Sequence, residues 1–199
     1  MTKSTASSSK PRERILDTAS ELFYQKGIQN VGVDEIVARS GVAKMTLYKH
    51  FQSKDLLVLE FLRRRDEHWR CWLEATVERY GTTPTERLLA IFEVLEEWFK
   101  SPDFRGCAFV NAAVELANRE HPAHQAVLEH KQLVQAYILK LAKDAEVHNS
   151  ESLSRHFMLL IEGAIVTALI EGSAEAAQQA RLAALALLEV QPKIDSTLR

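Results

Sequence analysis

The sequence contains few residues that interrupt helices, with seven glycines and five prolines among 199 residues. This shortage disfavours a turn-rich β architecture and favours long helices. Two cysteines are too few for a disulfide framework and suit a reducing compartment. The sequence has no run of about 18 uncharged apolar residues, and its first residues lack the apolar core of a signal peptide. We therefore expect a cytoplasmic protein with no membrane partner.

Patterns that mark catalytic or metal sites are also missing. We find no nucleophile–base pair, no paired Glu-x-x-His motifs and no phosphate-binding loop, and we expect neither an enzyme nor a cofactor. His121 and His124 are three residues apart and His130 follows on the same expected helix, but no cysteine pair or His/Glu ligand motif accompanies them. We expect these histidines to cap the helix or to face solvent, and we expect no metal site.

The net charge of −2 conceals an uneven distribution. Residues 1–70 contain 13 Lys and Arg against 9 Asp and Glu, whereas residues 71–199 contain 12 against 18. The segment 41–54 contains three lysines and one histidine and no acidic residue. A basic N-terminal part on an acidic remainder is the asymmetry that contacts with nucleic-acid phosphates require.

Apolar spacing predicts three short helices near the N-terminus. After a polar tail at residues 1–10, which we expect to be disordered, the first helix begins at Pro11 and ends at Gly27. Its apolar face consists of Ile15, Ala19, Leu22 and Phe23. A second helix ends near Arg39, and Gly41 is free to take a positive φ in the turn that follows. The third helix covers residues 44–51, with Leu47 and Phe51 facing inward. This arrangement is the plan of a helix-turn-helix.

The segment from Val33 to Leu56 makes the prediction specific. It contains Gly-Val, Thr-Leu-Tyr, His-Phe and Ser-Lys in that order, and it closely resembles the signature of the TetR family of repressors. The resemblance covers roughly residues 12–60. It implies a homodimer that binds operator DNA through the helix-turn-helix and senses a small molecule through the rest of the chain. A generic amphipathic hairpin would not require Tyr48, His50 and Lys54 at these spacings.

Helical geometry selects the side chains that can face DNA. If Leu47 and Phe51 point inward, Met45 and Lys49 lie on the opposite side of the third helix. The exposed face and N-terminal end of a recognition helix enter the major groove. The candidates for base and near-base contacts are therefore Lys44, Met45, Thr46 and Lys49. The resemblance implies that Tyr48, His50 and Lys54 bind DNA phosphates. Lys54 also begins a fourth helix, whose positive N-terminal end would face the phosphate backbone of the DNA.

Three positions depart from the family pattern. Ala43 stands where a capping serine is common, which removes a cap of about 1 kcal/mol. Gly32 stands where a capping threonine is common. Met45 can read DNA only through apolar contact, for instance with a thymine methyl group. We therefore expect the fold to persist, but the operator sequence of a relative cannot be transferred to this chain.

The remainder of the sequence predicts helices only. They cover approximately residues 54–80, 84–100, 107–117, 122–147, 150–171 and 173–190. Thr83 and Glu86 frame Pro84 in a capping box. We expect an all-α protein of about nine helices, with a DNA-binding domain at residues 11–55 and a ligand-binding and dimerisation domain at residues 56–199.

The last two helices are the expected dimer interface. Residues 150–171 are apolar around much of the helix, and residues 174–190 contain seven alanines that permit close helix approach. The expected interface residues are Phe157, Ile161, Ala164, Ile165, Ala168, Leu169, Ala180, Ala184 and Leu187. Glu162, the one acidic candidate for burial there, is expected to form hydrogen bonds within the dimer bundle.

An aromatic-rich set between these regions suggests a ligand pocket. The expected ligand-binding residues are Trp69, Trp72, Trp98, Phe109, Asn111 and Glu115. Residues 104–115 also look like those of a subgroup of TetR repressors in which some members sense electrophiles or oxidants through the cysteine. Cys107 follows Gly106 beside Arg105 at an expected helix start, which favours the thiolate. A buried, inert Cys107 is the alternative.

These observations predict a ligand-responsive transcriptional regulator. We expect a repressor that binds a near-palindromic operator as a homodimer and is released by a small-molecule inducer. Two alternatives stay open at this stage. One is the same scaffold acting as a thiol-based sensor through Cys107. The other is a helical-bundle protein with no role on DNA, which would not need the basic surface at residues 41–54.

Overall fold

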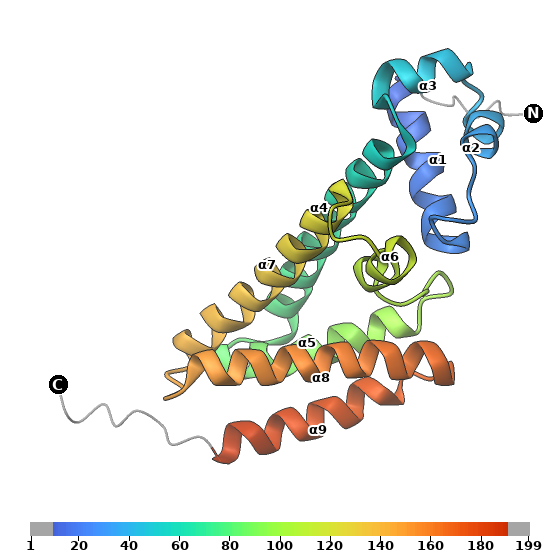
Figure 1. Cartoon of the computed structure of the whole chain (residues 1–199). Coiled ribbons are helices and arrows are strands. Elements are labelled where there is room, and N and C mark those ends of the chain that lie inside the picture. The colour runs from blue at the N-terminus through green and yellow to red at the C-terminus, as the bar shows by residue number, and fades with distance from the viewer. Residues whose placement is uncertain (1–9, 191–199) are drawn as a thin grey trace, which may run out of the picture. The chain divides into compact units, whose positions relative to one another are not determined.

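The computed structural model describes residues 10–190, and every regular element among them is an α-helix. These helices are α1 (Pro11–Lys26), α2 (Val33–Ser40), α3 (Lys44–Phe51), α4 (Lys54–Tyr80), α5 (Pro84–Phe99), α6 (Ala108–Leu116), α7 (Pro122–Asp144), α8 (Ser150–Glu171) and α9 (Glu175–Val190) (Figure 1). The expected all-α architecture of about nine helices is confirmed. The expected tail at residues 1–10 lies, apart from Lys10, outside the described residues.

The chain folds as two compact units. The head unit comprises the described residues up to Arg65 together with residues 108–127, and the body unit comprises residues 66–107 and 128–190. The helices α4 and α7 each contribute to both units. The compact units therefore do not coincide with the expected boundary at residue 55, because α6 joins the head unit. The assignment of roles to residues 11–55 and 56–199 stays a prediction.

Local sequence signals account for the helix boundaries around the head. Gly41 ends α2 in the left-handed conformation at φ 64°, as the sequence predicts. The Ser53 hydroxyl accepts the Leu56 N–H at 3.2 Å and caps α4. Neither Gly32 nor Ala43 supplies a side-chain cap to the helix that follows it. The third helix is therefore held by packing rather than by its cap.

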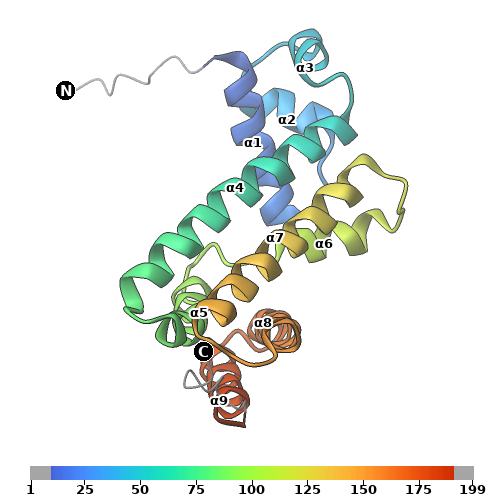
Figure 2. The ribbon, with the colours of Figure 1, turned by 90° about the vertical axis from the view of Figure 1, so that its left-hand side faces the viewer.

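The core of the head unit forms around α1. The buried face of α1 includes the four residues that apolar spacing predicts, Ile15, Ala19, Leu22 and Phe23. Both α2 and α3 pack against α1 (Figure 2), and Leu47 and Phe51 are the buried residues of α3. Full burial of such side chains contributes about 1.5–3 kcal/mol each. Two anchors of this size fix the rotation of α3 about its axis.

The body unit packs α5, α8 and α9 against one another, and Figure 2 shows these helices nearly end on. The Phe92 and Phe157 rings lie 5.6 Å apart where α5 meets α8. A capping box between Thr83 and Glu86 starts α5, as predicted. Within residues 10–190, α8 alone is long and apolar enough to cross a membrane by length and composition, a test that core helices also pass.

The end of α7 differs from the expectation. The sequence predicts a helix to about Val147, but α7 ends at Asp144. Glu146 takes a positive φ of 55°, and the Val147 N–H donates to the Ala142 carbonyl at 3.1 Å. This bond closes the helix end in the manner of a left-handed cap, although no glycine or asparagine marks the position.

Candidate nucleic-acid interface

The third helix presents a polar and basic face to solvent. Leu47 is fully buried and Phe51 is 3% exposed, whereas Met45 is 83% exposed and Tyr48 is 40% exposed. The other expected contact residues on this helix, Lys44, Lys49 and His50, are exposed, and Thr46 is half-buried. The structure thus places six of the seven expected DNA-contact residues on α3, with their side chains wholly or partly open to solvent.

One of these cations has a partner that the sequence did not reveal. The Lys44 ammonium lies 2.7 Å from a carboxylate oxygen of Asp34, at the start of α2. This hydrogen bond and the charge of Asp34 raise the pKa of Lys44 above its usual value. Ten residues and a turn separate the two side chains, so no helical periodicity could have paired them. Lys44 is therefore held beside an anion on the face expected to meet phosphates.

The seventh expected contact, Lys54, is less exposed than the others. Its ammonium lies 6.0 Å from the centre of the Phe23 ring, and its side chain is half-buried. Burial lowers the pKa of Lys54, while the charges of Asp55 and Glu115 oppose this effect. Lys54 therefore interacts with α1 and α6 inside the head unit as well as standing at the start of α4.

The sixth helix is tied to the α1–α2 loop by polar contacts. The Glu115 carboxylate accepts the backbone N–H of Gln29 at 2.9 Å, and the Gln29 side-chain amide donates to the Glu115 carbonyl. Gly27 has a φ of 89°, and a Cβ added there would lie 3.1 Å from the Glu115 carboxylate. The positive φ thus favours glycine at this position, and any larger side chain would also displace the Glu115 carboxylate.

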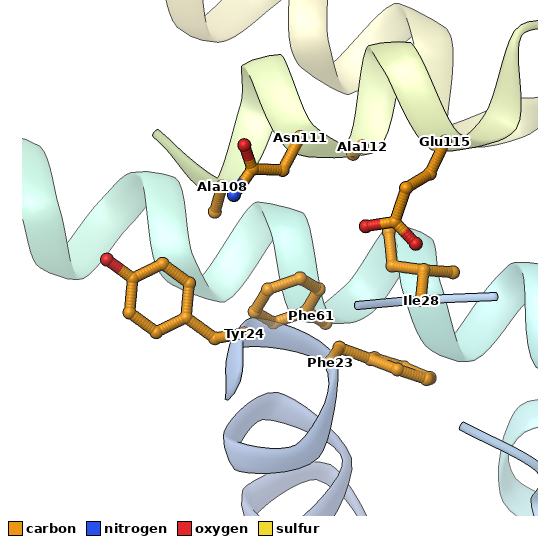
Figure 3. Close-up of a pocket in the computed structure, with 8 residues that line it drawn as sticks. All are labelled: Phe23, Tyr24, Ile28, Phe61, Ala108, Asn111, Ala112 and Glu115. Atoms are coloured by element: carbon orange, nitrogen blue, oxygen red, sulfur yellow. The ribbon is translucent and has the colours of Figure 1, made fainter. Parts of the chain in front are cut away.

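A small pocket lies between α1, α4 and α6 (Figure 3). Its volume of about 10 Å³ has room for roughly one water molecule. The lining residues are Phe23, Tyr24, Ile28, Phe61, Ala108, Asn111, Ala112 and Glu115, and in Figure 3 the Glu115 carboxylate points from α6 toward Ile28. Two expected ligand residues, Asn111 and Glu115, therefore line a pocket inside the head unit. Phe109 is buried in the same unit.

The other expected ligand residues belong to the body unit. Trp69 and Trp98 lie edge to face with ring centres 5.7 Å apart, and Phe104 lies 5.0 Å from Trp98. Trp72 is half-buried on α4, one turn from Trp69. The structure thus joins Trp69 and Trp98 in one aromatic cluster, and it places the α6 residues in the other compact unit.

A buried histidine completes this cluster. His130 is 4% exposed, its ring lies 5.5 Å from that of Trp69, and its Nδ1 lies 2.7 Å from the Asp66 carboxylate. Arg70 donates two hydrogen bonds to the same carboxylate, at 2.9 and 2.8 Å. The expectation that His130 caps a helix or faces solvent was wrong. His121 does act as a cap, because its Nδ1 accepts the Ala123 N–H at 3.1 Å.

Burial controls the protonation of this group. Burial lowers the pKa of His130 to about 4, because the hydrogen bond to Asp66 does not offset desolvation and the nearby Lys131 charge. The pKa of Asp66 is also below its usual value. Burial raises this pKa, but the hydrogen bonds from Arg70 and His130 together lower it by more than burial raises it. No group of three residues within the described part of the chain has a metal-ligand arrangement.

Cys107 is buried in the body unit and lies next to a lysine. It is 6% exposed, and its Sγ lies 3.4 Å from the Lys131 ammonium. Lys131 also pairs with Glu162 of α8. Glu162, which was expected to form hydrogen bonds within a dimer bundle, has a partner on α7 of its own chain. Cys71 is exposed.

The expected dimer residues lie mostly inside the chain's own core. Phe157, Ile161, Ala164, Ile165, Ala168, Ala180 and Ala184 are all buried by neighbouring helices of the same chain. Leu187 is half-buried, and Leu169 is 42% exposed. The seven buried residues therefore belong to the chain's own core, and the expected interface stays a prediction. The exposed large apolar residues of α8 and α9 are instead Leu159, Val166, Leu169, Ile170, Leu182 and Val190.

Comparisons with known proteins agree with this arrangement. The family model "Bacterial regulatory proteins, tetR family" matches residues 15–61, and "Tetracyclin repressor-like, C-terminal domain" matches residues 84–184. The crystal structure of SCO4454, a TetR-family transcriptional regulator from Streptomyces coelicolor, superposes with a TM-score of 0.82 at 31% identity. That similarity covers 89% of this chain and 95% of SCO4454.

Curated relatives carry the same regulatory description. The HTH-type transcriptional regulator LmrA of Bacillus subtilis is 29% identical over 164 residues, which is 81% of this chain and 82% of LmrA. The HTH-type transcriptional activator FasR of Mycolicibacterium smegmatis is 47% identical over 88 residues, which is 44% of this chain and 38% of FasR. These relatives are regulators rather than enzymes, as the sequence predicts. The chain belongs to the TetR family of transcriptional regulators.

Proposed function

We propose that the protein is a cytoplasmic repressor that binds a near-palindromic operator as a homodimer and dissociates when a small molecule binds. The exposed face of α3 is the observation that supports this proposal. Leu47 and Phe51 bury one side of the helix, so Met45, Tyr48 and the basic side chains remain open to solvent. In the proposed complex Lys44, Met45, Thr46 and Lys49 meet the bases, and Tyr48, His50 and Lys54 meet phosphates. Ligand binding moves α4, which contributes residues to both units, and so changes the spacing of two heads.

A second copy of the chain is the proposed occupant of the exposed apolar stripe on α8. Leu159, Val166 and Ile170 lie on one side of that helix, and Gly163 between them is exposed with no atom near its Cβ position. A patch with small and large apolar residues is suited to close contact with a symmetry-related helix. A homodimer also supplies the two reading heads that a near-palindrome requires.

Selection of bound duplexes from a random pool tests the function. The expected result is a motif with two half-sites, whose centres lie about one helical turn or a multiple of it apart, and a dimeric mass for the purified protein. A monomer that ignores all duplex DNA at low ionic strength would end the proposal. A reporter gene placed downstream of the selected operator then separates activation from repression. Repression lowers its expression when the protein is present, and activation raises it.

Replacement of Asp34 by asparagine should strengthen binding to all duplexes. The change removes an anion from the DNA-facing surface and frees Lys44, 2.7 Å away, for a phosphate. The slope of log affinity against log salt should steepen by about one, and affinity should rise several-fold at low salt. Fluorescence anisotropy at several salt concentrations measures both.

The control for this variant is Glu35→Gln, which makes the same charge change on the same helix. Glu35 pairs with Lys26 of α1 rather than with α3. Equal slopes for the two variants would mean that Lys44 makes no phosphate contact and that net charge alone accounts for the effect.

A second candidate mode, a thiol-based switch, rests on the contact between Cys107 and Lys131. The Lys131 ammonium lies 3.4 Å from the Cys107 Sγ, and a thiol can react with electrophiles. Cys107→Ser should abolish release of DNA by N-ethylmaleimide, and Cys71→Ser, at an exposed cysteine, should leave it unchanged. A gel shift after timed exposure to the reagent makes the measurement. If N-ethylmaleimide still released all of the DNA from the Cys107→Ser variant, this mode would be excluded.

A further inference from the structure

The first turn of α3 presents an apolar side chain to solvent. Met45 is 83% exposed, the largest exposed fraction among the large hydrophobic residues of the described chain. It is the second residue of α3, and the N-terminal residues of a recognition helix lie nearest the base edges. Removing apolar surface from water is favourable. Among the apolar residues of α3, Met45 therefore has the most surface left to bury against DNA.

The two anchors of α3 fix the direction in which Met45 points. Leu47 and Phe51 are the buried residues of this helix. At about 100° of rotation per residue, Met45 lies about 160° from Leu47 and about 120° from Phe51 around the helix axis. Met45 therefore points away from the core of the head unit, in agreement with its exposure.

The residues beside Met45 offer few groups that could form hydrogen bonds with a base. Residues 42–45 include one polar side chain, Lys44, and its ammonium lies 2.7 Å from the Asp34 carboxylate. The methionine thioether is itself only a weak acceptor. Its unbranched, flexible chain adapts to apolar surfaces. This end of α3 is therefore suited to an apolar group on a base.

The major groove offers one kind of apolar group, the methyl group on C5 of a pyrimidine. In unmodified DNA thymine alone carries this group, whereas cytosine presents an amino donor and has only hydrogen at C5. Methylation of cytosine at C5 places a methyl group at the same ring position as in thymine. Thymine and 5-methylcytosine thus share the surface that Met45 can contact, and uracil and unmodified cytosine lack it.

We propose that Met45 recognises the C5 methyl group of a pyrimidine in each half-site, so that operator affinity responds to cytosine methylation. At the position that Met45 contacts, 5-methylcytosine is bound more tightly than cytosine, and thymine more tightly than uracil. Methylation of the DNA is then an input separate from the small-molecule inducer. This inference rests on the proposed function as an operator-binding protein and defines the base chemistry that α3 reads.

Replacement of thymine by uracil, one position at a time in the selected operator, locates the contact. Each replacement removes one methyl group and keeps the base pair. We expect one thymine in each half-site at which uracil weakens binding of the full-length protein about four-fold. This is the effect expected for burial of one methyl group, since about 0.8 kcal/mol corresponds to about four-fold. An operator in which no replacement weakens binding even two-fold would overturn the proposal.

A pair of duplexes that differ in one methyl group tests the response to cytosine methylation. The T·A pair located by the uracil replacements is changed to C·G in one duplex and to 5-methylcytosine·G in the other. We expect the methylated duplex to bind about four-fold more tightly in fluorescence anisotropy. Equal binding of the two duplexes would overturn the proposal.

Substitutions on α3 connect the methyl effect to Met45. Because Met45 is exposed, Met45→Ala should fold as the wild type does. The affinity ratios of thymine to uracil and of 5-methylcytosine to cytosine should both fall to about one in Met45→Ala. Both ratios should persist in Met45→Leu, which keeps a large apolar side chain. Ratios in Met45→Ala as large as those of the wild type would exclude Met45 as the reader.

The matched control is Lys49→Ala, which removes another exposed side chain that is expected to contact the bases. It should weaken binding to every duplex and leave both ratios unchanged. The selection itself separates this inference from the function on which it rests. A motif with two half-sites that is bound equally with and without C5 methyl groups would contradict this inference alone. Failure to select any motif would contradict the proposed function, and this inference with it.

Discussion

Replacing Leu47 with alanine should destabilise the head unit by about 3 kcal/mol. Operator binding should weaken as well, because α3 is then held less firmly in its folded orientation. Leu47 is fully buried, and with Phe51 it is one of the two buried side chains of α3. Truncation of a buried leucine costs about 2–5 kcal/mol, because the lost transfer energy is joined by the cost of a cavity. The loss cannot be recovered by the cap of α3, since Ala43 contributes no side-chain bond.

The control for this prediction lies two residues away on the same helix. Met45 is 83% exposed, so Met45→Ala should change the unfolding free energy by less than about 0.5 kcal/mol. It should instead reduce discrimination among operator sequences. Urea unfolding followed by circular dichroism, together with fluorescence anisotropy on operator DNA, separates the two effects. Equal stability of Leu47→Ala and wild type would refute the anchor role of Leu47.

Local spacing accounts for the part of this protein that the sequence could predict. The four-residue face of α1 and the two anchors of α3 depend on helical periodicity alone, and all six residues are buried. The capping box of α5 and the positive φ of Gly41 likewise depend on short-range chemistry. Such features are predictable because each is decided within about two helical turns.

Interactions between distant segments could not be predicted in this way. His130 and Asp66 are 64 positions apart, and nothing on either helix identifies the other as a partner. The same holds for Lys131 and Glu162, 31 positions apart. Glu115 lies in the part of the sequence expected to bind ligand, but its hydrogen bond to Gln29 places it in the head unit.

The proposed dimer surface illustrates a different limit. The eighth helix is apolar on two sides, and periodicity cannot decide which side the protein's own core will cover. The stripe with the larger aromatic and β-branched residues, which includes Phe157 and Ile161, is covered by the chain itself. The stripe through Leu159, Val166 and Ile170 is left exposed. The exposed stripe, rather than the dominant one, is therefore the surface that the proposed dimer would use.

Lowering the pH from 7 to 4 should remove about 3 kcal/mol of stability through His130 alone. Burial lowers the pKa of folded His130 to about 4, against about 6.5 in the unfolded chain. Between these values the unfolded state binds a proton that the folded state does not, so acid favours unfolding. The contribution is complete above pH 6.5 and is lost as the pH falls toward 4. Asp66, whose pKa is also lowered, adds a loss of the same sign at lower pH, below its usual value of 3.8.

A variant that keeps the hydrogen bond but cannot titrate tests this assignment. The side-chain amide of His130→Gln can still donate to Asp66, whose carboxylate lies 2.7 Å from the histidine Nδ1. The variant should unfold with a much shallower pH dependence between 6.5 and 4. His68→Gln, on the exposed face of α4, should retain the wild-type dependence. Because His130→Gln also changes packing, the slopes of unfolding free energy against pH are compared rather than the values at one pH. Parallel slopes for His130→Gln and wild type would show that His130 is already charged in the folded protein.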